Sequence, residues 1–216
     1  MDEDNLYFIF ENCSYGDLST LISKSKNGLD NEMAVQYAAE IVTALEFMHG
    51  KGYVHRDLKP ENIMIGDDKH VRIIDLGDSK NFESFESCAE ITNNYMHKKE
   101  NPEEVDENEF FQSEDSGSDS RGTFCGTALY VSPEMLEESL AIPASDLWAL
   151  GCIIYRMHSR LVPFQGPTEI ATFEKILKRE IIWPDNMSPD TCDIIDRLLQ
   201  VDPRKRLGYQ DFHELK

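Results

Sequence analysis

Three side chains with complementary chemistry stand within residues 55–62. The Asp57 carboxylate can accept a proton from a hydroxyl, and the Lys59 ammonium can neutralise charge on a phosphate. The side-chain oxygen of Asn62 can ligate a metal ion. A second acid, Asp75, follows thirteen residues later at the end of an apolar run. A base, a cation and two metal ligands in this order indicate phosphoryl transfer.

Two neighbours of Asp57 could support this chemistry. Arg56 places a fixed positive charge beside the acid, and His55 could brace the loop through hydrogen bonds. A loop does not hold such groups in place by itself, so flanking helices and strands must position them.

The flanking sequence predicts a mainly α fold with a short β-hairpin (α+β). Asp30 is suited to cap a helix that ends near Gly50, because apolar residues recur between them at helical spacing. Turn residues at 66–68 separate two short apolar runs and predict a hairpin of 63–65 with 71–74. The other expected elements are a strand at 6–11 and helices at 17–24, 147–157, 170–178 and 192–200.

Composition restricts the classes of partner. The chain has 216 residues and a net charge of −20. Its densest basic stretch is only 204–206, so we expect no nucleic acid and no direct membrane contact. Five scattered cysteines without metal-ligand spacing indicate reduced thiols. We find no signal-peptide pattern and no apolar run that could span a bilayer, and therefore expect a cytoplasmic or nuclear protein.

Residues 83–121 differ from the rest of the chain. Between Glu83 and Asp119 there are twelve acidic residues and two lysines. High charge and few apolar residues predict a disordered insertion. It could be inert, or it could be regulatory, with phosphorylation at its serines, which are Ser113, Ser116, Ser118 and Ser120.

From residue 6 to 216 the chain resembles the C-terminal lobe of a eukaryotic protein kinase. The segments at 39–46, 127–134 and 145–155 are similar to the phosphoinositide-dependent protein kinase family of the AGC group. The resemblance rests on an ordered series of motifs: His55-Arg56-Asp57 with Asn62, Asp75-Leu76-Gly77, Gly126-Thr127, Ser132-Pro133-Glu134, Asp146 with Trp148 and Gly151, and Arg206.

This resemblance implies a serine/threonine protein kinase that uses ATP and Mg²⁺. Its protein substrates would be the activation loops of related kinases. Asp57, Lys59 and Asn62 would be catalytic, and Asn62 and Asp75 would hold the metal. Lys59 also favours serine and threonine over tyrosine as acceptors. Leu76 replaces the usual phenylalanine of the metal-binding turn, and we expect little loss from that change.

The resemblance also implies nucleotide contacts. Phe10 would be the gatekeeper, although Phe10 and Met64 could equally be ordinary core residues. Asp17 would meet the ribose, although it could equally be a helix N-cap. The full expected set is Glu11, Cys13, Asp17, Lys59, Glu61, Asn62, Met64 and Asp75.

Further positions follow from the same comparison. Thr123 would be an activation-segment phosphosite that pairs with Arg56, although the residues alone also allow an ordinary loop threonine. Thr127 would help shape the substrate site. Asp146 would brace the catalytic loop, and Glu134 would form a buried ion pair with Arg206.

The resemblance covers only part of a kinase domain. Residues 1–216 lack the glycine-rich loop and the strand lysine of an N-terminal lobe, so we expect a fragment or truncated chain whose N-terminal lobe is mostly absent. The alternative is a truncated, non-catalytic kinase-like scaffold. The intact Asp57, Asn62 and Asp75 favour the enzyme, but we expect the isolated chain to be inactive.

Overall fold

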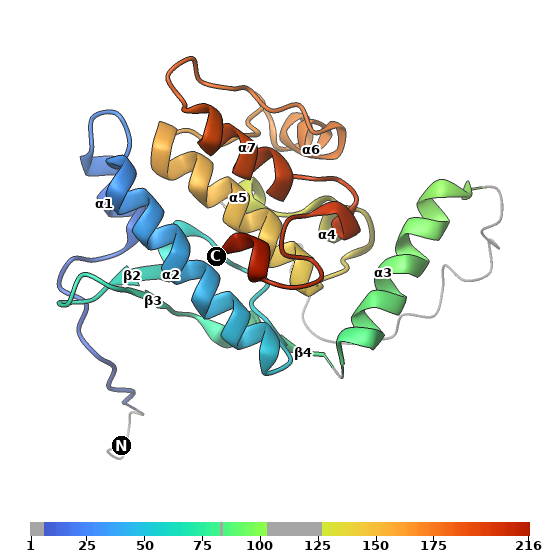
Figure 1. Cartoon of the computed structure of the whole chain (residues 1–216), viewed down its shortest axis with the longest axis horizontal. Coiled ribbons are helices and arrows are strands. Elements are labelled where there is room, and N and C mark those ends of the chain that lie inside the picture. Colours follow the sequence, from blue (N-terminus) through green and yellow to red (C-terminus); the bar gives the residue numbers. More distant parts are fainter. Residues whose placement is uncertain (1–6, 83, 103–126) are drawn as a thin grey trace.

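The apolar helix α5 (Pro143–Ser159) lies at the centre of the fold. The computed structural model describes residues 7–82, 84–102 and 127–216 (Figure 1). Helices α2 (Asn31–Gly50) and α7 (Pro189–Leu198) pack against α5. Trp148 of α5 is fully buried and stacks on Phe164. A helix that is apolar on all sides has no face suited to water, so neighbouring helices must cover it.

Side-chain caps start several helices, of which α1 (Leu18–Lys24) and α2 begin where the sequence predicts, whereas α7 begins at 189 and not at the expected 192. Asp17 caps α1, and Asp30 caps α2 by accepting a hydrogen bond from Met33 N at 2.9 Å. Thr168 caps α6 (Glu169–Lys178), and Ser188 caps α7. Each cap satisfies a backbone N–H that the first helical turn leaves free.

Helix α5 starts earlier than expected. The predicted helix began at 147, but the observed one begins at Pro143 and includes Ser145 and Asp146. Proline suits a first turn because the missing N–H would have no helical partner there. The shorter α4 (Pro133–Glu138) also begins with a proline.

The strands form two small antiparallel pairs. Strands β2 (Ile63–Ile65) and β3 (Val71–Ile73) make the predicted hairpin, with Ile63 opposite Ile73. Strand β1 (Tyr53–Val54) pairs with β4 (Lys80–Asn81). The mainly α fold with short hairpins is therefore confirmed. The 3₁₀ turns in the described part of the chain include η1 (Pro60–Asn62), η2 (Leu76–Asp78), η5 (Thr127–Tyr130), η6 (Pro203–Lys205) and η7 (His213–Leu215).

The strand predicted at 6–11 is wrong for the residues that the structure describes. Residues 7–13 have no regular secondary structure, and the side chains of Tyr7, Phe8, Ile9 and Phe10 are 60–95% exposed. A strand needs a neighbour to satisfy its backbone groups. Within the described part of the chain, no strand pairs with this segment.

The prediction of disorder across 83–121 is wrong for residues 85–100, which form α3 (Phe85–Glu100). Ser84 caps α3 by accepting from Ser87 N at 3.1 Å. The prediction rested on the average charge of the segment, which does not reveal a narrow buried stripe of residues at helical spacing. Its residues are Cys88, Thr92, Tyr95 and Met96. Residues 103–121, with the four candidate serines, lie outside the described part.

Candidate active site

Asp57 lies at the centre of a hydrogen-bonded cluster. Its Oδ2 accepts from Lys59 Nζ at 2.6 Å and from Asn62 Nδ2 at 3.1 Å, and Asn62 Nδ2 also donates to the Asp57 carbonyl at 2.9 Å. Among the described residues, the buried Asp57 Oδ1 has no hydrogen-bond partner. An unpaired buried acceptor is costly and usually marks a functional position. The three predicted catalytic side chains are therefore in contact, with one oxygen available.

Helix α5 holds the loop that carries Asp57. Asp146 Oδ2 accepts from His55 N at 2.9 Å, and Asp146 Oδ1 accepts from Arg56 N at 3.0 Å. The His49 ring contacts the same carboxylate at 2.8 Å. Asp146 is 1% exposed, so these contacts form away from water and hold the loop firmly. The expected bracing contact of Asp146 is thus present.

Two residues of the site have left-handed backbone conformations. Arg56 has φ 74° and Asp75 has φ 61°, which non-glycine residues rarely adopt. Such conformations persist only where surrounding contacts impose them, and they concentrate at functional sites. At Arg56 the constraint comes from Asp146.

The two predicted metal ligands stand at one end of the β2–β3 hairpin. Ile74 N donates to the Asn62 carbonyl at 2.9 Å, so Asp75 follows directly after a residue bonded to Asn62. His55 Nε2 contacts the Ile74 carbonyl at 3.1 Å and links this hairpin to the catalytic loop. A carboxylate and an amide oxygen are the ligand types that Mg²⁺ takes. The donor set therefore fits a hard cation.

No group of three or more His, Cys, Asp or Glu in the described ranges could hold a metal without help. Mg²⁺ commonly binds only one or two protein carboxylates and completes its coordination with phosphate and water oxygens.

The expected nucleotide residues that lie outside the catalytic loop and Asp75 divide into two groups. Asp17 and Met64 form a β-bridge and so lie side by side. Asp17 is an N-cap, with Oδ1 accepting from Thr20 N and Oδ2 from Thr20 Oγ1, both at 2.8 Å. Burial raises the pKa of Asp17, but the hydrogen bonds from Thr20 and nearby backbone lower it overall. Asp17 therefore caps helix α1, which was the alternative to a ribose contact.

The other group lies on the segment without regular structure. Glu11 is largely exposed and pairs with Arg72 at 3.4 Å, and Phe10 is 83% exposed. Cys13 is partly buried, and its carbonyl accepts from Gly16 N at 3.0 Å. The structure does not bring Phe10 or Glu11 into contact with Asp57, and the core alternative for Phe10 is wrong here.

Glu134 and Arg206 form the expected buried ion pair. Arg206 Nη1 and Nη2 donate to Glu134 Oε1 and Oε2 at 2.7 and 2.6 Å, and both side chains are 0% exposed. Ser145 Oγ donates to the same carboxylate at 2.7 Å. Burial raises the pKa of Glu134, but Arg206 and these hydrogen bonds lower it overall. The pair has a structural role, because it joins α4, α5 and the residue that follows η6.

Two predicted residues cannot be placed around this site. Thr123 lies outside the described part of the chain. Thr127 opens η5, and only its backbone is described.

Sequence reasoning missed Arg156 of α5. Its Nη1 donates to Glu61 Oε1 at 3.2 Å and to the Tyr130 hydroxyl, and its Nη2 donates to Ser19 Oγ at 2.9 Å. It therefore connects α1, η1, η5 and α5. An arginine at a helical position of α5 carries no signal of this role, because its partners are 26 or more residues away in sequence.

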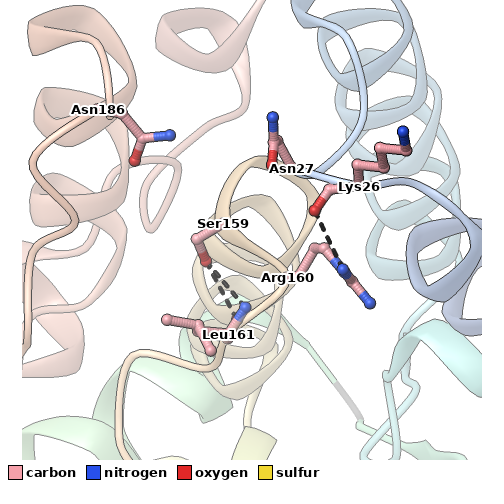
Figure 2. A pocket seen from close by; sticks show the side chains of 6 residues that line it. All are labelled: Lys26, Asn27, Ser159, Arg160, Leu161 and Asn186. Atoms are coloured by element: carbon pink, nitrogen blue, oxygen red, sulfur yellow. Dashed lines mark hydrogen bonds between the residues drawn. The ribbon is translucent and has the colours of Figure 1, made fainter.

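An open pocket of about 380 Å³ lies where the C-terminal ends of α1 and α5 meet (Figure 2). Its lining is Lys26, Asn27, Ser159, Arg160, Leu161 and Asn186. It shares no residue with the Asp57 cluster, so it has no part in the expected chemistry.

Within the described residues, no helix combines the length and apolar character that crossing a membrane requires.

Residues 1–216 match the family described as protein kinase domain. The chain is 41% identical over 205 residues to 3-phosphoinositide-dependent protein kinase B of Dictyostelium discoideum, covering 95% of this chain and 19% of that protein. It is 39% identical over 210 residues to 3-phosphoinositide-dependent protein kinase 1 of Rattus norvegicus, covering 97% of this chain and 32% of that protein.

A third relative is serine/threonine-protein kinase ksg1 of Schizosaccharomyces pombe, 37% identical over 214 residues, covering 99% of this chain and 33% of that protein. The chain thus spans between 19% and 33% of the length of these three relatives.

Proposed function

The chain belongs to the protein kinase domain family, and on this basis we propose that it carries the catalytic loop of an ATP-dependent serine/threonine kinase. The proposal rests on the Asp57 cluster. Lys59 and Asn62 donate hydrogen bonds to Asp57 Oδ2, whereas Oδ1 has no partner among the described residues. A carboxylate fixed on one side and available on the other is suited to orient a substrate hydroxyl.

In this proposal each residue has one task. Asp57 Oδ1 accepts the hydrogen bond of a serine or threonine hydroxyl and then its proton. Lys59, held 2.6 Å from Asp57, neutralises charge on the transferring phosphoryl group. Asp146 and His55 keep the loop in place, so little reorganisation is needed during the reaction.

Asn62 and Asp75 would hold Mg²⁺, which when bound neutralises the phosphates of ATP. Lys59, Glu61 and the Asp17–Met64 side of the site would contact the nucleotide, together with Glu11 and Cys13. As the resemblance to the phosphoinositide-dependent protein kinase family implies, its protein substrates would be the activation loops of other kinases in the cytoplasm. By the same similarity, phosphorylation of Thr123 supplies a charge partner for Arg56.

The test is phosphate transfer from radiolabelled ATP to a serine-containing protein substrate by the full-length protein. We expect Asp57→Asn to lower kcat by at least about a thousandfold, because it removes the base while keeping the shape of the side chain. Asp185→Asn, an exposed loop change, is the matched control. Wild-type kcat in Asp57→Asn would refute the proposal.

A further inference from the structure

Helix α3 is anchored on the rest of the fold at its C-terminal end. Glu137 of α4 accepts hydrogen bonds from the Tyr95 hydroxyl and from Lys99 Nζ, the latter at 2.7 and 2.8 Å. Glu100, the last residue of α3, accepts from Arg204 Nη2 at 2.9 Å. Two separate contacts therefore fix this end of the helix, one on α4 and one on η6.

Tyr95 lies at the centre of the contact with α4. Its side chain is 4% exposed, and it shares its acceptor, Glu137 Oε2, with Lys99. Burial raises the pKa of Tyr95, and the carboxylates of Glu137 and Glu134 raise it further, so the phenol stays protonated and can donate. The influence of Glu134 also shows that the ring lies near the buried ion pair with Arg206. The docked end of α3 thus rests on a firmly held part of the fold.

The N-terminal end of α3 continues from the strand beside the catalytic loop. Strand β4 pairs with β1, with Lys80 opposite Val54, the last residue before the loop at 55–62. Phe82 N then donates to the Gly52 carbonyl at 2.8 Å, and α3 begins three residues later. Helix α3 therefore links the strand pair next to the catalytic loop with α4.

The turn that carries Asp75 depends on backbone bonds at its two ends. Residues 74–78 are all exposed, so packing within the described part of the chain holds little of the turn. Ile74 N bonds to the Asn62 carbonyl at one end, and β4 pairs with β1 at the other. A pair of two-residue strands is marginally stable by itself. Because a helix is stiff along its length, anchoring α3 also restrains β4 and the turn before it.

On the basis of the proposed kinase function, we propose that Tyr95, Lys99 and Glu137 are positioning residues for the metal-binding turn. By docking α3 on α4 they hold β4 against β1, and this keeps Asp75 in register with Asn62. The first part of the acidic insertion, α3, is therefore a brace for the site.

The test measures hydrogen exchange in the full-length protein without nucleotide. Glu137→Lys sets two positive charges against each other at the α3–α4 contact. We expect the amides at 79–82 to exchange about tenfold faster, because α3 undocks and β4 frays. The double variant Glu137→Lys/Lys99→Glu restores an ion pair with the charges exchanged. We expect its exchange at 79–82 to lie within about twofold of wild type.

The magnesium dependence of phosphate transfer is the second readout. We expect Glu137→Lys to raise the Mg²⁺ concentration that gives the half-maximal rate by about fivefold. The rate at saturating Mg²⁺ should stay within about twofold of wild type, because the Asp57 cluster is unchanged. A general loss of stability would instead lower the rate at every Mg²⁺ concentration.

Glu138 provides the matched control. It is the next residue of α4 and is exposed, and none of the hydrogen bonds that join α3 to α4 in the described ranges includes it. Glu138→Lys therefore makes the same change of charge at the adjacent position without opposing Lys99. We expect it to change both readouts by less than about twofold.

Tyr95→Phe guards against misfolding of the charge variants, because it removes only a hydroxyl. We expect exchange at 79–82 to increase by about threefold in this variant. The inference is overturned if exchange at 79–82 in Glu137→Lys and Tyr95→Phe matches wild type, if Glu138→Lys has an equal effect, or if the double variant is no closer to wild type than Glu137→Lys. Exchange is measured without catalysis, so failure of the Asp57→Asn test would leave these results standing.

Discussion

Breaking the Glu134–Arg206 pair should destabilise the fold more than any exposed ion pair. Both side chains are 0% exposed, with two parallel bonds of 2.7 and 2.6 Å. Glu134→Ala leaves the Arg206 guanidinium buried without its acid. Two remaining acceptors, the carbonyls of Gln200 and Ala144, satisfy only part of its donors. We therefore expect a loss of about 3–5 kcal/mol in the free energy of unfolding.

This loss is measurable by differential scanning calorimetry and urea unfolding. For a chain of this size, it corresponds to a decrease in Tm of roughly 6–20 °C. Glu174→Gln is the control, because Glu174 and Lys178 are 3.7 Å apart and 63% and 62% exposed. That change should cost less than about 0.5 kcal/mol.

The pH dependence gives an independent readout. Because the pKa of Glu134 is lowered in the folded state, its contribution is present above the unfolded pKa of about 4.3 and is lost as pH falls through the folded value. Glu134→Gln should therefore make stability less sensitive to acid. A loss below about 1 kcal/mol for Glu134→Ala would contradict this reasoning, because it would mean that water or another group solvates Arg206.

Two further predictions concern the surface. His70 Nδ1 lies 2.6 Å from Glu40 Oε1, and this hydrogen bond and charge raise the pKa of His70. The contribution of the pair is complete below the unfolded pKa and is lost as pH rises through the folded value. NMR titration should show the His70 pKa decrease in Glu40→Gln, and an unchanged value would count against the contact. Glu137 accepts from Tyr95 and Lys99 and so fastens α3 to α4. Glu137→Ala should accelerate hydrogen exchange in α3 but not in α5, and equal exchange in α3 before and after would contradict the docking.

Local sequence determined the helix starts and the hairpin. Asp17, Asp30 and Ser188 cap helices because a short polar side chain reaches the free N–H groups of the first turn. The motif of Asp57, Lys59 and Asn62 was also readable, since all three lie on one short loop and meet within it.

Only the tertiary structure decided contacts between distant segments. Charge composition predicted disorder at 85–100, but packing of a narrow stripe and the bonds of Tyr95 and Lys99 to Glu137 hold α3 in place. The segment at 7–13 has strand composition, but no strand among the described residues pairs with it.

The same distinction applies to the site. The sequence identified Asp57 as the candidate catalytic carboxylate, whereas the fold supplied Asp146 from 90 residues away to hold its loop. It also brought Arg156 to Glu61 from 95 residues away. Residue type fixes what a group can do, but its charge partners depend on which helices pack together, and packing is a property of the whole chain.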